Sequence, residues 1–310
     1  MSRIHDALKK AEQEKAQLDS QDSFTETKLP GAPVLDRWAG ARPGLNQPPL
    51  ADATGRIGKG DPVLESVLER CQHQDWNTDP TLTQNVDPRR HTLVSEEFRS
   101  LRSRLYLIRK VQTLHKLLIT SPLPQEGKTF VAANLARVIA KQPDCRILLI
   151  DADLRIPAMH RALGALATPG LSEFLAGAID ITAVLQRGPS DNLYFIPGGK
   201  VVANPTELIS NGRFESLMKR MTPAFDWIII DSPPVIPVSD ARMLAGFCDG
   251  VMLLINAGTT PHDLARKACG EFAKNQLLGV ILNRVEKDHS YGSYYYLGKG
   301  DHTKGNGKGA

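Results

Sequence analysis

Short apolar runs separated by stretches of helical length fill the middle of the chain. The runs LLIT, ILLI, WIII and VMLLI have the length of buried strands. Continuous apolar strands that alternate with helices predict an α/β fold, with a mainly parallel sheet and helices on both faces. Ligand-binding groups are then expected at the carboxyl ends of the strands. The predicted strands are Lys116–Thr120, Arg146–Ile150, Leu193–Ile196, Trp227–Ile230, Gly250–Ile255 and Gly279–Leu282.

The same pattern divides the 310 residues into four regions. Residues 91–288 carry the alternating strands and helices and form the predicted folded domain. Residues 19–90 are rich in Pro, Gly, Asp and Gln, which predicts a mostly disordered linker. Residues 289–310 are rich in Gly, Lys and Tyr and predict a disordered tail. Residues 1–18 predict a charged helix.

Two amphipathic helices are predicted outside the folded domain. The N-terminal one indicates either a docking element or a solvated, frayed terminus. The second is a short helix that interrupts the linker. Their apolar positions are Ile4, Ala7, Leu8 and Ala11 in the first helix and Val63, Leu64, Val67, Leu68 and Cys71 in the second.

Composition and charge argue against several classes of protein. The apolar runs are far shorter than the ~20 residues of a spanning helix, and the N-terminus lacks the apolar segment of a secretion signal, so we expect a cytoplasmic protein. Four cysteines without CxxC spacing indicate reduced thiols rather than disulfides or a zinc site. A net charge of +4 is too diffuse to predict nucleic acid binding, although it is compatible with weak attraction to an anionic membrane.

The segment LLITSPLPQEGKTF runs from a predicted strand through a Pro-rich loop into a predicted helix. Backbone N–H groups of such a loop and of the first helical turn bind phosphate. Lys128 can reach the β- and γ-phosphates of a nucleotide, and the Thr129 hydroxyl is placed to ligate Mg²⁺. The alternative is a surface turn with an incidental GKT. The predicted nucleotide contacts are Pro124, Gln125, Glu126, Gly127, Lys128, Thr129 and Phe130.

The loop departs from the common GxxxxGK[ST] pattern at two positions. Pro122 stands in place of the first glycine, which an extended start of the loop tolerates. Gln125 stands where related loops often carry a second glycine. If that position requires a positive φ, the Gln side chain carries a steric cost that Gly would not.

Three aspartates follow two of the predicted strands. LLIDADLRIP places Asp151 and Asp153 at one strand end, and WIIIDSPPV places Asp231 at another. A single Asp after a strand is commonly a helix N-cap, but two such endings beside a phosphate loop indicate a catalytic site. The three carboxylates are expected to share Mg²⁺ and water, or one of them accepts the proton of an attacking hydroxyl.

These motifs resemble those of the bacterial tyrosine kinases, known as BY-kinases. LLIDADLRIP is similar to their second Asp-bearing motif, Walker A′, and WIIIDSPP is similar to their Walker B motif. The similarity covers the predicted domain and the tail, about two thirds of the chain. It implies a P-loop NTPase fold and the cytoplasmic kinase of an exopolysaccharide export system, in the branch whose kinase is separate from its membrane activator.

The resemblance also implies a role for each site residue. Asp151 would assist deprotonation of the substrate tyrosine, and Asn283, after the last strand, would lie near the nucleobase. The residues implied to be catalytic are Lys128, Asp151, Asp153 and Asp231, and those implied to hold Mg²⁺ are Thr129, Asp153 and Asp231. The implied cofactors are ATP and Mg²⁺.

A predicted helix over Val94–Lys110 separates apolar from charged residues. Phe98, Leu101, Leu105 and Ile108 lie on one face, whereas the charges of SEEFRSLR lie on the other. Such a stripe is commonly a solvated face, but SEEFRSLR is similar to the ExxRxxR motif through which the family assembles rings. The residues implied to form this interface are Glu96, Arg99 and Arg102.

The tail contains the aromatic cluster YGSYYYLG. Aromatic residues this dense in a Gly- and Lys-rich segment cannot form a core, so they are either exposed tail residues or phosphate acceptors. The family carries a C-terminal tyrosine cluster, which implies that they are acceptors. The implied autophosphorylation sites are Tyr291, Tyr294, Tyr295 and Tyr296.

Taken together, the resemblance implies an ATP- and Mg²⁺-dependent tyrosine autokinase that regulates exopolysaccharide polymerisation and export. Its implied partners are further copies in a ring, an inner-membrane polysaccharide co-polymerase that activates it and holds it at the membrane, and a tyrosine phosphatase. One alternative is a positioning or partitioning ATPase, which usually carries a signature lysine where Leu123 stands. Another is a non-catalytic nucleotide-binding scaffold, for which Gln125 is the argument.

Overall fold

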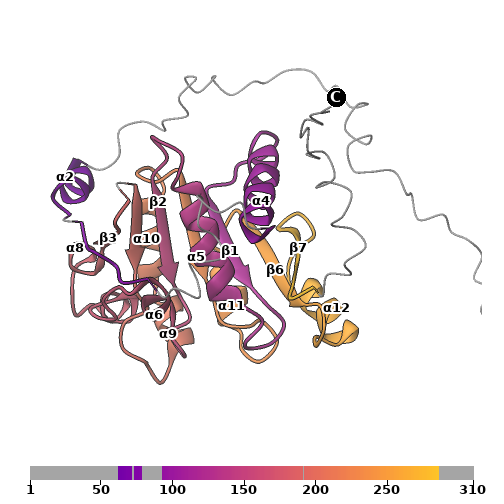
Figure 1. Cartoon of the computed structure of the whole chain (residues 1–310). Coiled ribbons are helices and arrows are strands. Elements are labelled where there is room, and N and C mark those ends of the chain that lie inside the picture. Colours follow the sequence, from indigo (N-terminus) through magenta and orange to yellow (C-terminus); the bar gives the residue numbers. More distant parts are fainter. Residues whose placement is uncertain (1–61, 72, 79–92, 191, 286–310) are drawn as a thin grey trace, which may run out of the picture. The chain divides into compact units, whose positions relative to one another are not determined.

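A central sheet organises the computed structural model, which describes residues 62–71, 73–78, 93–190 and 192–285 (Figure 1). The strand order is β3-β4-β2-β5-β1-β6-β7, and every neighbouring pair is parallel except β3 and β4. This confirms the predicted mainly parallel sheet. The strands are β1 Lys116–Thr120, β2 Ile147–Asp151, β3 Gln186–Arg187, β4 Leu193–Ile196, β5 Trp227–Asp231, β6 Gly250–Asn256 and β7 Leu277–Asn283.

Helices cover both faces of the sheet because alternate residues of the central strands point to opposite sides. In β1, Leu118 joins one apolar cluster, whereas Leu117 and Ile119 join the other. Helices α4, α5 and α6 pack on one face, and α2 and α7 to α12 pack on the other. The helices are α2 Pro62–Arg70, α4 Leu93–Arg109, α5 Lys128–Ile139, α6 Met159–Leu163, α7 Leu171–Leu175, α8 Ile181–Val184, α9 Pro205–Ser210, α10 Arg213–Met221, α11 Asp240–Ala245 and α12 His262–Gly270.

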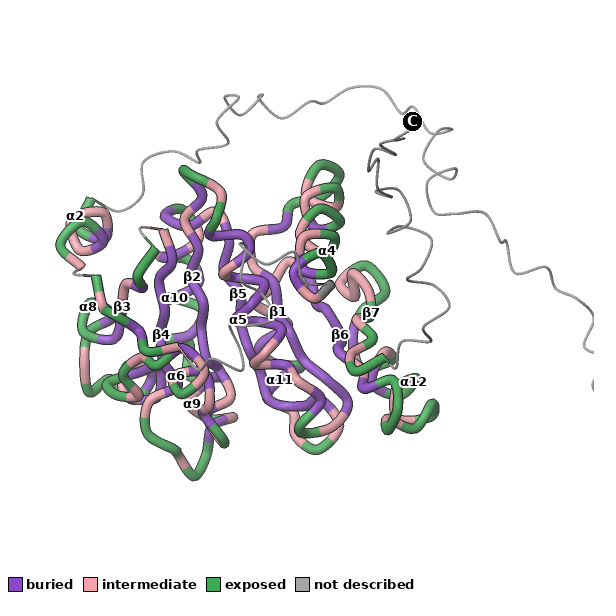
Figure 2. Tube along the Cα trace, in the orientation of Figure 1, coloured by how far each residue is buried: buried purple, intermediate pink, exposed green. Residues whose placement is uncertain are grey.

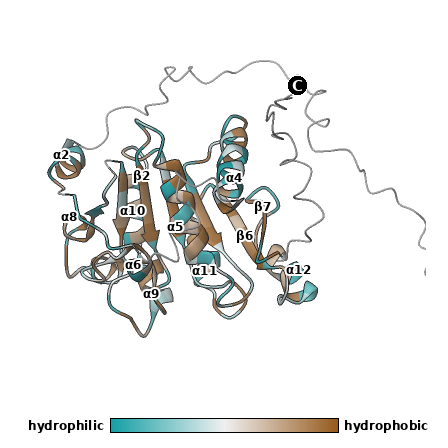
Figure 3. Ribbon diagram, viewed as in Figure 1, coloured by the Kyte–Doolittle hydropathy of each residue, from teal (hydrophilic) through white to brown (hydrophobic). Residues whose placement is uncertain are grey.

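The central strands β1, β2, β5 and β6 are mostly apolar and mostly buried, as Figures 2 and 3 show. β2 and β5 contain no exposed residue, which fits continuous apolar runs covered on both faces. The strand β3 was not predicted, because two residues of mixed polarity, Gln186 and Arg187, carry no strand signal. In the described ranges, none of the helices combines the length and the apolar character that crossing a bilayer requires.

An N-terminal strap, residues 62–71 and 73–78, packs along the β3 and β4 edge. Leu64 and Leu68 of α2 are 1% exposed and join one apolar cluster. Trp76 joins the other, where its ring meets Phe195 edge-on at 5.9 Å. The predicted short helix of the linker therefore exists, and its contacts place it with the folded domain, N-terminal to the predicted boundary at residue 91. The predicted regions 1–18 and 289–310 lie outside the described residues.

Candidate active site

The loop between β1 and α5 has the backbone of a phosphate cradle. Gly127, the N-cap of α5, has φ 102° and contributes no side chain to the first helical turn. The N–H groups of that turn are therefore available to an anion, and the helix dipole favours negative charge there. Gln125 has φ 61°, so the position does adopt the left-handed conformation that a Gln side chain disfavours. Lys128 follows at the start of the helix and is 7% exposed.

Hydrogen bonds of the Glu126 side chain stabilise this loop. Its carboxylate accepts a hydrogen bond from the Leu123 N–H at 3.0 Å and another from the Thr260 hydroxyl. The residue is 3% exposed, so the side chain stabilises the loop, and only its backbone can face a nucleotide. Sequence reasoning missed Thr260, which lies 134 positions away and carries no motif.

Asn283 lies against the same loop. Its side-chain amide donates to the backbone carbonyl of Glu126 at 2.7 Å. A Cβ atom at Gly127 would meet the end of this flexible side chain, and the φ of 102° at Gly127 favours glycine in its own right. The structure thus places Asn283 beside the phosphate loop, at the carboxyl end of β7.

Asp151 and Asp231 end two neighbouring strands and lie directly opposite each other in the sheet register. Both are buried, with exposures of 0% and 1%. Asp231 Oδ2 accepts a hydrogen bond from the Thr129 hydroxyl at 2.6 Å. Its other oxygen, Oδ1, is buried without a hydrogen-bond partner among the described residues. A carboxylate oxygen left free beside a threonine hydroxyl fits the oxygen ligands of a Mg²⁺ shell.

Asp151 organises the chain that follows β2. Its Oδ2 accepts hydrogen bonds from the N–H groups of Ala158 at 3.1 Å and Met159 at 3.0 Å, and its Oδ1 accepts one from Asp153 at 3.3 Å. These bonds fold residues 152–158 into a tight loop over the carboxylate. Asp153 is less buried than the other two aspartates, and its Oδ1 accepts from the Ile156 N–H at 3.1 Å.

Burial raises the pKa of all three carboxylates. The pKa of Asp151 is raised to about 7, mainly by burial, against the hydrogen bond from the Met159 N–H. Burial and then the charge of Asp151 raise the pKa of Asp231 well above its usual range, while Thr129 and Lys128 act in the opposite direction. Burial also raises the pKa of Asp153. Clustered perturbed groups of this kind are typical of a functional site.

An ion pair between the half-exposed Arg155 and the buried Asp240 holds the loop after β2 against α9 and α11. Arg155 donates from Nε to Asp240 Oδ2 at 2.7 Å and from Nη2 to Oδ1 at 3.2 Å. Thr206 also donates to Asp240 Oδ1, at 2.6 Å. Asp240 is 1% exposed, and it joins the loop to α9 and α11. Sequence reasoning missed this contact because nothing local to SDARML indicates its partner.

The predicted interface residues lie on α4, where the apolar face packs as expected. Glu96 is exposed and forms an ion pair with Arg99 one turn later. Arg102 departs from the prediction that all three charges face away from the fold. Its Nη1 donates to the backbone carbonyl of Val138 in α5 at 3.1 Å, because its long side chain bends across the helix pair. The predicted acceptor tyrosines lie outside the described residues.

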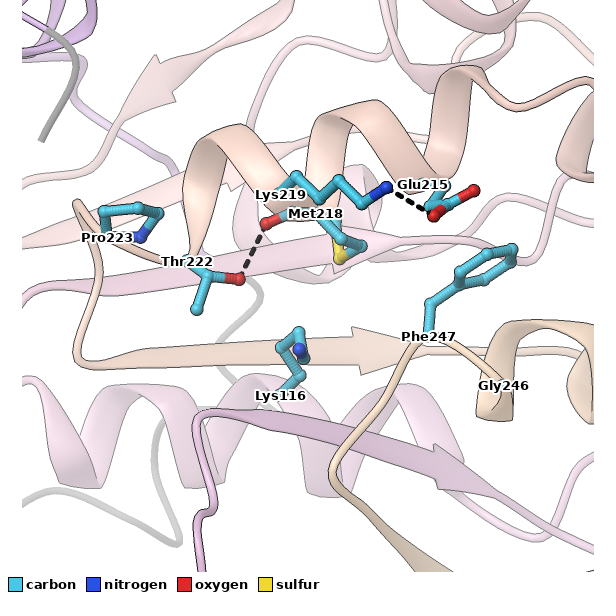
Figure 4. Close-up of a pocket in the computed structure, with 8 residues that line it drawn as sticks. All are labelled: Lys116, Glu215, Met218, Lys219, Thr222, Pro223, Gly246 and Phe247. Atoms are coloured by element: carbon cyan, nitrogen blue, oxygen red, sulfur yellow. Dashed lines mark hydrogen bonds and ion pairs between the residues drawn. The ribbon is translucent and has the colours of Figure 1, made fainter. Parts of the chain in front are cut away.

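A separate pocket of about 440 Å³ lies at the amino end of the sheet (Figure 4). Its charged side chains are already paired: Lys219 contacts Glu215 at 2.6 Å, and Lys116 contacts Asp249 at 3.2 Å. Because Lys116 begins β1 and the phosphate loop follows its end, this pocket is distinct from the candidate site. Its lining residues are Lys116, Glu215, Met218, Lys219, Thr222, Pro223, Gly246 and Phe247.

Comparisons with known proteins identify the family of this chain. A family model described as AAA domain matches residues 126–259. Tyrosine-protein kinase YwqD of Bacillus subtilis (strain 168) is 36% identical over 207 residues, covering 66% of this chain and 87% of that protein. Tyrosine-protein kinase CpsD of Streptococcus agalactiae is 35% identical over 213 residues, covering 67% of this chain and 92% of that protein.

The solved structures give the same result. The kinase domain of the Escherichia coli tyrosine kinase ETK superposes with a TM-score of 0.60 and 31% identity, covering 71% of this chain and 85% of that one. The matches therefore extend over nearly all of two short kinases and over an isolated kinase domain. This chain belongs to the family of bacterial tyrosine-protein kinases.

Proposed function

We propose that this protein is an ATP- and Mg²⁺-dependent tyrosine autokinase whose site is the carboxyl end of the sheet. The observation that carries the proposal is the free, buried oxygen of Asp231 beside Thr129 and Lys128. A catalytic phosphate site needs both a cation position and an anion cradle, and this arrangement supplies the two side by side. A positioning ATPase on the same fold has no specific observation in its favour here.

The nucleotide-binding residues divide into backbone and side-chain contributions. The N–H groups of residues 125–130 would bind the phosphates, Pro124 having no N–H, and the Lys128 ammonium would neutralise charge at the transferred phosphoryl group. Asn283, beside the loop, would border the base. The Mg²⁺ would be held by Thr129, Asp153 and Asp231, directly or through water. Bound there, the cation would offset the negative charge that develops during phosphoryl transfer.

The proton of the acceptor tyrosine would go to Asp151. A carboxylate with a pKa of about 7 accepts a proton far better than an ordinary surface aspartate at neutral pH. Asp151 has no exposed surface, however, and two backbone N–H groups already occupy its Oδ2. The acceptor hydroxyl can therefore reach the carboxylate only when the loop of residues 152–158 shifts, which couples substrate entry to base exposure.

The acceptors would be Tyr291, Tyr294, Tyr295 and Tyr296 of a neighbouring subunit. A ring would be assembled through α4, where Glu96 is exposed, Arg99 is half-exposed and Arg102 donates a hydrogen bond to α5. Such a ring would bring the tail of one subunit to the site of the next at high effective concentration. Phosphorylation cycles would then regulate exopolysaccharide polymerisation and export, with a separate inner-membrane activator and a tyrosine phosphatase as partners. Similarity to the kinase family supports this cellular role.

The test is phosphotyrosine mapping on the purified full chain with Mg²⁺ and labelled ATP. Label on the tail tyrosines is the expected result, and its loss in the variant with all four changed to Phe, at unchanged ATP affinity, would assign the acceptors. Hydrolysis of ATP without phosphotyrosine would replace the kinase with a positioning ATPase. ATP binding without hydrolysis and without phosphotyrosine would indicate a non-catalytic nucleotide-binding scaffold.

A further inference from the structure

Among the residues that the structure describes, β7 forms an uncovered edge of the sheet. Its one neighbour among the described strands is β6. Val280 and Leu282 are 43% and 61% exposed, although they belong to an otherwise apolar strand. Register pairs them with Leu253 and Ile255, so both lie on the same face, two residues apart. Figure 2 shows this strand exposed or half-exposed where the central strands are buried.

The neighbouring elements do not cover this apolar stripe of Val280 and Leu282. Helix α12 on the same face contributes a single buried residue, Ala268, within the part of the chain that the structure describes. The opposite edge of the sheet is protected, because the strap makes a β-bridge to Arg187 through His73. A free apolar edge strand is a template for pairing with another strand.

The chain leaves β7 in a way that favours a return along it. Arg284, directly after the strand, has φ 55°, a left-handed conformation typical of turns that reverse direction. The sequence continues within ten residues into SYYYLG. Tyr294 and Tyr296 stand two positions apart, the same spacing as Val280 and Leu282. In an extended segment, side chains two apart share a face.

We propose that the chain's own residues 293–297 dock on β7 as an antiparallel edge strand, with Tyr294 beside Leu282 and Tyr296 beside Val280. Aromatic residues favour strands, and pairs of aromatic and branched aliphatic side chains stabilise neighbouring strands. An antiparallel strand at the edge of a parallel sheet is a common arrangement, and β3 already provides one here. The backbone groups on the free side of β7 would supply the hydrogen bonds.

The effect of this docking on activity rests on the proposed function. A tail held on β7 of its own subunit is withheld from the neighbour's site, so docking would slow autophosphorylation. Phosphate on Tyr294 or Tyr296 adds about −1.5 to −2 charges and would disfavour return to an apolar stripe. The uncovered edge would thus hold the tail before phosphorylation and release it afterwards.

Amide hydrogen exchange of the full chain tests the docking without any kinase activity. The protein is dephosphorylated, kept free of ATP, and compared with a synthetic peptide of residues 286–310. We expect residues 293–297 of the protein to exchange at least about tenfold more slowly than the peptide. Leu282→Glu and the uncharged Leu282→Ser should remove this protection. Leu166→Glu is the matched control, because Leu166 is equally exposed at 59% but lies by β3.

Exchange at the free-peptide rate in the parent protein would overturn the proposal, as would equal loss of protection in Leu166→Glu. Protection that rises with protein concentration would assign the stripe to the tail of a second copy instead. Phosphotyrosine formation is measured separately on Leu282→Glu and should be faster than in the parent. A chain without any kinase activity would end the proposed function and leave the exchange result standing.

Discussion

The two ends of the sheet hold aspartates in opposite states: half-buried and paired at the amino end, and fully buried and unpaired among the described residues at the carboxyl end. At the amino end, Asp249 accepts hydrogen bonds from the N–H groups of His115 and Lys116, both at 2.8 Å, and pairs with the Lys116 ammonium. At the carboxyl end, Asp151 and Asp231 face each other, and neither forms an ion pair with a described residue. A paired carboxylate stabilises a fold, whereas two unpaired ones close together destabilise it.

The difference identifies the site without reference to any motif. The half-buried charge of Asp249 is tolerated at the amino end because its partners are built into the chain. At the carboxyl end the described residues supply no ion-pair partner, which is the arrangement expected where a cation and a phosphate group complete the site. The two unpaired carboxylates lower the stability of the fold, and the same end of the sheet can bind the cation and the phosphate group.

The largest expected effect is on phosphoryl transfer. Changing Lys128→Met removes the ammonium next to the phosphate loop, and we expect the rate of phosphotyrosine formation to fall by about 100- to 1,000-fold, as for loss of a major electrostatic contact. The rate is measured with Mg²⁺ and ATP on the full chain. Lys219→Met, at the amino end, removes a lysine that is already paired with Glu215 and should leave the rate unchanged. Equal rates in both variants would remove Lys128 from the mechanism.

Removal of Asp249 tests the opposite end. Asp249→Ala leaves two backbone N–H groups without their acceptor, so the free energy of unfolding should fall by about 2–3 kcal/mol. Denaturant unfolding measures this loss. Glu215→Ala, which removes one partner of an exposed ion pair, should cost less than about 0.5 kcal/mol. Phosphotyrosine formation per folded molecule should be unchanged in Asp249→Ala. A specific loss of activity would contradict the claim that the amino end serves stability and not catalysis.

The pH dependence of stability sharpens the comparison. Because the pKa of Asp151 is raised to about 7 from an ordinary value of 3.8, folding takes up a proton. The favourable contribution is complete below the ordinary value and is lost as the pH rises through the folded-state value. Without Mg²⁺ and nucleotide, the melting temperature of the parent should therefore decline from pH 5 to pH 8 more steeply than that of Asp151→Asn. Parallel declines would contradict the assigned shift.

The smallest effect concerns the strained glutamine. Gln125 has a positive φ, which costs about 1–2 kcal/mol in a residue other than glycine. Gln125→Gly relieves this cost but adds chain entropy to the unfolded state, so a net stabilisation of about 0.5 kcal/mol is expected. Gln125→Ala keeps the strained backbone and should give no gain. A destabilised Gly variant would show that the Gln side chain makes a contact that outweighs the strain.

Short sequence patterns predicted the features that depend on residues close together in the chain. The apolar runs gave the central strands to within two residues at each end, because strands buried on both faces need uninterrupted apolar sequence. The phosphate loop and the aspartates at strand ends were likewise predictable, since each motif lies within ten residues. The strand ends then bring these groups to one edge by topology alone.

Contacts between distant positions were not predictable in the same way. Arg155 and Asp240 are 85 positions apart, and neither segment carries a signal for the other. The strap was assigned to the linker because its few apolar residues, such as Trp76, stand in a polar, Pro- and Gly-rich setting. Arg102 was placed on the outer face because helical spacing cannot show that a long side chain bends toward α5.

The most direct test of the account is Asp231→Asn, studied for stability and activity together. Loss of the charge facing Asp151 should leave the melting temperature at pH 8 without Mg²⁺ equal to or above that of the parent. Phosphotyrosine formation should nevertheless fall by at least about 100-fold, and added Mg²⁺ and ATP should stabilise the variant less than the parent. A variant that melts earlier, or one that retains its phosphotyrosine, would contradict the claim that this carboxylate lowers stability in order to serve catalysis.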